Sequence, residues 1–109
     1  MSAQMRHPKL VRDRVPDLIR SRGQVAETTV LSGGDYTTAL LDKLVEEAVE
    51  LRIAPPGQHI EELADVWEVL TTAVAQLGFT MDEVEQAATF KRIVRGGFDE
   101  RLWLEPATG

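Results

Sequence analysis

Apolar residues recur every three or four positions along two long stretches of the chain, a spacing that is typical of amphipathic helices. The first predicted helix covers about residues 35–53, and the second covers about residues 58–77. Pro55-Pro56-Gly57 ends the first helix and leaves room for only a short loop, so we expect two antiparallel neighbours. The apolar stripes consist of Leu40, Leu41, Leu44, Val45, Ala48 and Leu51 in the first helix and of Ile60, Leu63, Val66, Trp67, Leu70, Ala73, Val74 and Leu77 in the second.

Punctuating residues predict two further helices. Pro16 near a first turn and Gly23 just past a last turn indicate a short helix in the N-terminal region. Thr80 and Glu83 have the capping-box spacing, which predicts the start of a third long helix that ends near Arg95.

Two short segments complete the predicted fold. Residues 27–31 are rich in β-branched side chains and should be extended, and residues 101–104 have the pattern of a short strand. A lone strand cannot satisfy its backbone groups, so we expect these segments to pair. The predicted fold class is mainly α, an antiparallel helical hairpin or bundle with a short two-stranded β ribbon.

Each long helix carries two carboxylates at one border of its apolar stripe. Glu47 and Glu50 are three residues apart, as are Glu62 and Asp65, so each pair lies together on its helix surface. In an antiparallel hairpin, Glu50 falls opposite Glu62 and Glu47 falls opposite Asp65. We therefore expect these four carboxylates to lie near one another. Three other acidic residues of the same stretch point more toward solvent: Glu46, Glu61 and Glu68.

Such a cluster of like charges has two interpretations. Neighbouring carboxylates raise one another's pKa and cost on the order of 1 kcal/mol per pair, so the side chains either splay into water or surround a hard divalent cation. Oxygen ligands without Cys or His favour Mg²⁺, with Mn²⁺ as an alternative. A di-iron site is less favoured because it needs Glu-x-x-His, whereas the chain has the reversed His59-x-x-Glu62 at the loop.

The chain has 109 residues, which is the length of one small domain. We place this domain at residues 9–104, between a flexible tail at 1–8 and a C-terminal tail at 105–109. A core this small is marginal alone, which favours a partner subunit. The absence of cysteine excludes disulfides and thiolate metal sites. No apolar run has the length of a membrane span, and the N-terminus has no signal-peptide centre, so we expect a cytoplasmic location without membrane association. A net charge of −6 argues against general nucleic-acid binding.

Four sequence blocks carry a resemblance to a known family. "EEAVE" followed by "ELAD" fits the E-E-x-x-E … E-x-x-D signature of MazG-like all-α nucleoside triphosphate pyrophosphohydrolases, and the chain most resembles the phosphoribosyl-ATP pyrophosphohydrolase-like branch. Glu50 and Glu62 are separated by 11 residues, slightly fewer than in many members, which shortens the hairpin loop. The blocks are "KLVRDRVP" (9–16), "KLVEEAVE" (43–50), "ELADVWEV" (62–69) and "KRIVRGGFDERLWL" (91–104).

The resemblance implies Mg²⁺-dependent cleavage of a nucleotide between the α- and β-phosphates with release of pyrophosphate. House-cleaning of nucleotides is one biological role that such a reaction would serve. It also implies that Glu47, Glu50, Glu62 and Asp65 are the metal ligands, the same four that the hairpin geometry selects. Glu46 is a further catalytic candidate that would orient water or a second metal, and its alternative is a solvent-facing helix residue. Two hairpins packed as a homodimer or homotetramer would bury apolar faces that one hairpin leaves open.

Basic residues near the chain ends are candidates for substrate binding. The resemblance implies that Lys9, Arg12 and Asp13 lie over the nucleotide, whereas Asp13 is otherwise explained as a helix N-cap or a salt-bridge partner of Arg12. Lys91 and Arg95 are one turn apart near the end of the third long helix. They form either a phosphate clamp or surface charge that the helix dipole favours.

Lys43 lies one turn before Glu47 and either contacts phosphate or pairs with that carboxylate. A rival function from another class is a non-catalytic nucleotide-binding or scaffold module built on the same helices. Hydrolysis of phosphoribosyl-ATP in histidine biosynthesis is a third interpretation, less favoured because both terminal blocks resemble the "-like" branch.

Overall fold

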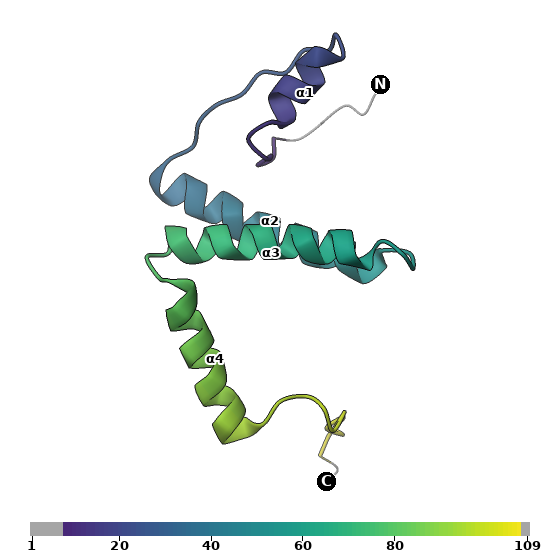
Figure 1. Cartoon of the computed structure of the whole chain (residues 1–109), viewed down its shortest axis with the longest axis vertical. Helices are drawn as coiled ribbons and strands as arrows, with labels where there is room; N and C mark the ends of the chain where they lie inside the picture. Colours follow the sequence, from purple (N-terminus) through teal and green to yellow (C-terminus); the bar gives the residue numbers. More distant parts are fainter. Residues whose placement is uncertain (1–7, 108–109) are drawn as a thin grey trace.

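The computed structural model describes residues 8–107, and these residues form four helices (Figure 1). The helices are α1 (Val15–Ser21), α2 (Gly33–Ile53), α3 (His59–Gln76) and α4 (Met81–Arg95). Each one matches a helix expected from the sequence, so the prediction of a mainly α fold is confirmed. The tail predicted at residues 1–8 lies outside the described residues except for Pro8, and residues 108–109 of the other predicted tail also lie outside them.

Local sequence signals account for the ends of the helices. Thr80 Oγ1 accepts a hydrogen bond from the Glu83 backbone N–H at 3.1 Å, and Glu83 Oε1 accepts one from the Thr80 backbone N–H at 2.9 Å. This pair is the predicted capping box at the start of α4. Pro55 follows shortly after α2 and cannot continue it. Gly78 follows α3 with a φ of 89°, a left-handed conformation that glycine adopts without strain.

The α2 and α3 helices form an antiparallel hairpin, as the short loop predicted. The Gln76 side-chain amide at the end of α3 donates a hydrogen bond to Thr37 Oγ1 in the first turns of α2, at 3.0 Å. The buried apolar side chains lie close to this contact. Leu40 follows Thr37 closely in α2, and Ala73 and Val74 closely precede Gln76 in α3. The small core of the chain is therefore at the end of the hairpin that is distant from the Pro-Pro-Gly loop.

The other two helices lie on opposite sides of the hairpin (Figure 1). Among the described helices, α2 packs on α3 and α3 packs on α4, whereas α1 packs on none of them. The radius of gyration is 18.4 Å, well above the roughly 13 Å expected for a compact domain of this length. A single chain is therefore an open arrangement around one hairpin.

The predicted β ribbon is wrong, because residues 8–107 contain no strand. Residues 27–31 lie in the connection between α1 and α2, while residues 101–104 follow α4 at the other end of the molecule (Figure 1). Because α4 leads away from the hairpin, the two segments do not meet. Val30 and Leu104 are almost fully exposed, so water can satisfy the backbone that the ribbon was expected to pair.

The predicted apolar stripes of the hairpin are only partly buried. Each hairpin helix keeps apolar side chains exposed at helical spacing, and we call this surface the outer stripe. It consists of Leu41, Val45 and Val49 on α2 and of Ile60, Leu63 and Trp67 on α3. Trp67 is 59% exposed, which is unusual for so large an apolar side chain. None of the described helices has the length and apolarity needed to cross a bilayer.

Candidate metal centre

Three carboxylates converge on one face of the hairpin. Glu47 comes from α2, and Glu62 and Asp65 come from α3; one oxygen of each lies within 4.8 Å of the others. The antiparallel register accounts for this meeting, because Glu62 and Asp65 are one turn apart on the helix surface that faces Glu47. We call these three residues the carboxylate cluster.

The carboxylate cluster contains buried oxygen atoms that accept no hydrogen bond within residues 8–107. Glu47 is only 5% exposed, although charged side chains are seldom so deeply buried. Its Oε2 atom and the Oε2 atom of Glu62 are buried and accept no hydrogen bond from the described residues. A buried unsatisfied oxygen needs a physical explanation, and a bound cation is one that suits two carboxylates of a converging cluster. The donor set, oxygen only, fits Mg²⁺ or Mn²⁺ better than Zn²⁺.

Lys43 supplies a positive charge from within α2. Its Nζ atom lies 3.0 Å from Glu46 Oε1 and 3.3 Å from Glu47 Oε1, and its side chain is 16% exposed. Burial acts to lower the pKa of Lys43, but hydrogen bonds and charge interactions with Glu46 and Glu47 outweigh burial and raise it. Lys43 is therefore a charged partner of Glu47, as one of its two predicted roles required.

The surroundings of Glu47 disfavour its ionised form. Burial raises the pKa of Glu47 above its ordinary value, and the negative charge of Glu50 raises it further. Lys43 acts in the opposite direction, and Asp65 adds a smaller upward effect. The net rise means that the contact with Lys43 does not offset the combined effect of burial and of the neighbouring carboxylates.

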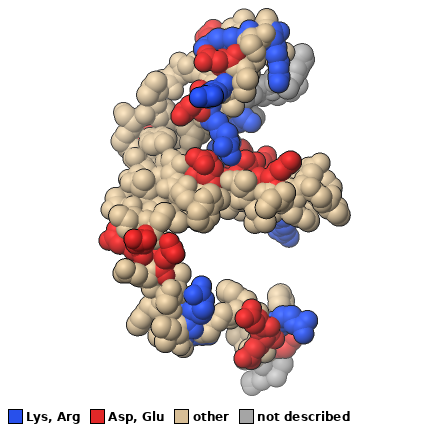
Figure 2. Space-filling view, in the orientation of Figure 1, with Lys and Arg blue, Asp and Glu red and all other residues tan. Residues whose placement is uncertain are grey.

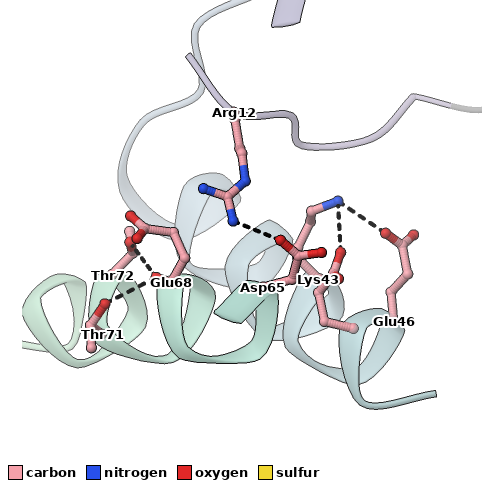
Figure 3. Close-up of polar contacts among 8 residues, drawn as sticks. Arg12, Lys43, Glu46, Asp65, Glu68, Thr71 and Thr72 are labelled. Atoms are coloured by element: carbon pink, nitrogen blue, oxygen red, sulfur yellow. Dashed lines mark hydrogen bonds and ion pairs between the residues drawn. The ribbon is translucent and has the colours of Figure 1, made fainter. Parts of the chain in front are cut away.

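Arg12 reaches the carboxylate cluster from the N-terminal region. Its Nη2 atom donates a hydrogen bond to Asp65 Oδ1 at 2.7 Å, which also makes an ion pair (Figure 3). Figure 2 shows the wider pattern, in which acidic side chains line the face of the hairpin that is turned toward the N-terminal region and basic side chains of that region lie above them. The cluster is thus covered from one side by positive charge.

The structure brings together only part of the predicted site. Glu50 is exposed and is not one of the three residues whose oxygens converge, although it is near enough to influence Glu47. Glu46 pairs with Lys43, and its side chain is 42% exposed. Lys91 and Arg95 lie on α4, which leaves the hairpin on the side opposite α1 (Figure 1), so within one chain they are remote from the cluster.

The two remaining substrate-binding candidates lie near α1. Lys9 lines a cavity of about 170 Å³ between the start of the described chain and α2, together with Asp42 and Glu46. The N-cap residue of α1 is Arg14, and Arg12 pairs with Asp65, so neither of the local roles considered for Asp13 is observed.

Sequence reasoning missed two features of this region. The first is the Arg12–Asp65 contact, which joins residues 53 positions apart and which no local sequence pattern predicts. The second feature is Asp42, which lines the cavity beside Glu46. The sequence could have indicated it, because Asp42 lies four residues before Glu46 on the same helix surface.

Comparisons with known proteins leave the family open. A protein of Mycolicibacterium smegmatis, described as uncharacterized, is 50% identical over 46 residues. Those residues make up 42% of this chain and 47% of that protein, so the chain covers about half the length of its relative. No protein-family model matches the chain. No solved structure has significant similarity to it.

Proposed function

We propose that the chain is a Mg²⁺-dependent nucleotide pyrophosphohydrolase, which cleaves a nucleoside triphosphate or a related nucleotide between the α- and β-phosphates. The observation that carries the proposal is the carboxylate cluster, in which Glu47 is buried and retains an oxygen without a hydrogen-bond donor. The MazG-like resemblance of four ordered sequence blocks supports this reaction class over other uses of a divalent cation.

In the proposed reaction, Glu47, Glu62 and Asp65 hold the ion, with Glu50 as the fourth predicted ligand. Mg²⁺ supplies charge neutralisation of phosphate oxygens and lowers the pKa of a bound water. The chain supplies the position of the ligands, because Glu47 is fixed by burial and by Lys43.

Positive side chains beside the carboxylate cluster serve the phosphates in this proposal. Lys43 and Arg12 are in contact with the cluster, and Lys9 lines the neighbouring cavity. A triphosphate carries several negative charges, so its approach to an acidic face requires such cations as well as the metal. Glu46 is held by Lys43 beside this cavity, which suits the proposed role of orienting water.

We also propose that the chain acts as a homodimer or homotetramer. The outer stripe and the exposed apolar residues of α4, which include Phe90 and Ile93, exceed what an isolated soluble chain commonly leaves exposed. A second hairpin packed on this surface would provide the core that the open chain lacks. In such an assembly Lys91 and Arg95 would reach the phosphates of a neighbouring site, since they are remote from the cluster of their own chain.

Release of pyrophosphate tests the catalytic proposal directly. We expect the purified protein with Mg²⁺ to release pyrophosphate from at least one member of a panel of ordinary and damaged nucleoside triphosphates. Asp65→Asn should lower the rate by more than about 100-fold, because even residues that only orient metal ligands are worth about 10- to 100-fold. Glu61→Gln, which changes an exposed carboxylate of the same helix, is the matched control and should keep the wild-type rate. Full activity of Asp65→Asn would remove the basis of the proposal.

The second candidate is a non-catalytic nucleotide-binding or scaffold module, which the extent of exposed apolar surface favours. Calorimetry separates the two functions. Heat of nucleotide binding in Mg²⁺ together with no product after several hours would support the module, whereas turnover of the bound nucleotide would support the enzyme.

A further inference from the structure

We propose that the N-terminal arm, residues 8–31, is a latch that Arg12 closes over the carboxylate cluster in the metal-free protein and that a divalent cation opens. The inference rests on the metal site of the proposed function and adds to it a competition between Arg12 and the metal for Asp65. It does not depend on catalysis, so it can be tested in protein that holds no nucleotide.

The arm has few attachments to the rest of the described chain. Its helix, α1, packs on no other helix. Arg12–Asp65 is the one side-chain hydrogen bond and the one ion pair that joins the arm to the hairpin within residues 8–107. Pro8, Lys9 and Leu10 also approach the hairpin, where they line the cavity of about 170 Å³ next to α2. A single polar side-chain contact therefore joins the arm to the hairpin, and Figure 3 shows it reaching down from the arm.

That contact falls on a member of the metal site. Asp65 is one of the three carboxylates that converge, and Arg12 bonds to its Oδ1 atom at 2.7 Å. A guanidinium and a divalent ion on the same carboxylate would lie only a few ångströms apart and would repel each other. Lys43 is less easily displaced than Arg12, because it belongs to α2 itself and stays bonded to Glu46. The metal is therefore expected to separate Arg12 from Asp65 while leaving Lys43 in place.

The strength of the latch is suited to reversible opening. The Arg12 and Asp65 side chains are 57% and 40% exposed, and exposed ion pairs contribute little net stability. A pair of this kind can lower metal affinity by about two- to fivefold, enough to measure and too little to keep the metal out. Opening would also free the Arg12 guanidinium for another anion.

Pulsed spin-label distance measurements test the latch. The chain contains no cysteine, so Ser21→Cys at the end of α1 and Ala75→Cys near the end of α3 provide two unique label sites, both exposed. Labelled chains are diluted into unlabelled protein so that only distances within one chain contribute. We expect a narrow distance distribution without metal and a broad one in saturating Mg²⁺. Arg12→Gln should be broad in both conditions, and the matched control Arg14→Gln should behave as wild type.

Calorimetric titration with Mg²⁺ completes the test. Arg12→Gln should bind Mg²⁺ about two- to fivefold more tightly than Arg14→Gln, which removes the same charge from the same arm but has no partner on the cluster. Equal affinities, or a distance distribution that stays narrow while Mg²⁺ binds, would overturn the latch and leave the metal site standing. Absence of Mg²⁺ binding in both proteins would overturn the metal site and the latch together.

Discussion

Glu47→Gln distinguishes two roles of Glu47. If Glu47 is a metal ligand, its substitution should stabilise the metal-free protein, whereas if Glu47 is a structural ion-pair partner of Lys43, the substitution should destabilise it. The substitution removes a buried charge with little change in side-chain volume. Lys43 keeps its contact with Glu46 at 3.0 Å, so the lysine is not left without a partner. The new amide N–H lies in the same cluster as Glu62, whose buried Oε2 atom has no donor among the described residues of the wild type.

The expected gain follows from the unsatisfied oxygen. A buried polar group without a partner costs roughly 1–3 kcal/mol, and loss of the 3.3 Å contact with Lys43 offsets part of the gain. We therefore expect the metal-free variant to be more stable than wild type by about 1 kcal/mol at pH 7. For a domain of this size that corresponds to a rise in Tm of about 4 °C.

The gain should depend on pH in a defined direction. Burial and the charge of Glu50 raise the pKa of Glu47 in the folded state above its unfolded value of about 4.5. The stability contributed by protonated Glu47 is thus fully present below about pH 4.5 and is lost as the pH rises through the folded-state pKa. The difference between Glu47→Gln and wild type should be largest at neutral pH and should fall toward pH 4.5.

Urea unfolding of the two proteins, with and without Mg²⁺, measures both effects. Mg²⁺ at about 100 times its Kd should stabilise wild type by about 2.7 kcal/mol, and Glu47→Gln should lose most of that stabilisation. Glu61→Gln is the control on an exposed carboxylate and should retain it. A metal-free Glu47→Gln that is less stable than wild type at pH 7, with an unchanged response to Mg²⁺, would refute the reasoning and identify Glu47 as a structural partner of Lys43.

Three further substitutions test other parts of the structure. Lys43→Met leaves the buried Glu47 without its cation and should lower the free energy of unfolding by about 1–3 kcal/mol in metal-free urea titrations at pH 7, whereas no loss would show that Lys43 is dispensable. Thr80→Ala removes the capping box of α4 and should cost about 1 kcal/mol in thermal unfolding, and an unchanged Tm would mean that α4 adds nothing to cooperative stability. Trp67→Glu places a charge on the outer stripe and should shift sedimentation from the proposed oligomer toward monomer, with an unchanged oligomer excluding this surface as the interface.

The helices could be predicted from the sequence because their signals are local. The apolar spacing, the capping box at Thr80 and the break at Pro55 each act over a few residues, and each has its expected effect in the structure. The meeting of Glu47 with Asp65 was also predictable, since a short loop between two helices leaves little freedom of register.

Other features depend on rotation or on distant residues, which one sequence does not specify. Glu50 was expected beside Glu62, but a modest rotation of α2 separates a position at the edge of the seam from an exposed one. The predicted β ribbon was wrong because a segment that favours an extended backbone does not specify which other segment lies beside it. Arg12 and Asp65 meet only because the arm passes over the hairpin, an arrangement that no helical or strand period encodes.

The charge balance of the site leads to a prediction about the order of binding. Four carboxylates and two cations are in contact or converge here, which leaves two uncompensated negative charges when every group is ionised. The cations are Lys43 and Arg12, and the carboxylates are Glu46, Glu47, Glu62 and Asp65. One divalent ion would neutralise this excess, whereas a triphosphate alone would add to it. Nucleotide should therefore bind only after, or together with, the metal.

Calorimetry with a non-hydrolysable triphosphate tests this order. We expect measurable binding in Mg²⁺ and none in EDTA. The metal-free Glu47→Gln variant should also show no measurable binding, because one uncompensated negative charge remains and the bridging cation is still absent. Equal affinity in EDTA and in Mg²⁺ would mean that Lys and Arg side chains hold the phosphates directly and that the carboxylates serve another purpose. Metal dependence would instead support an order of events in which the metal binds the acidic face first. The ion that neutralises Asp65 then frees the Arg12 guanidinium, which can bind the phosphate of the nucleotide.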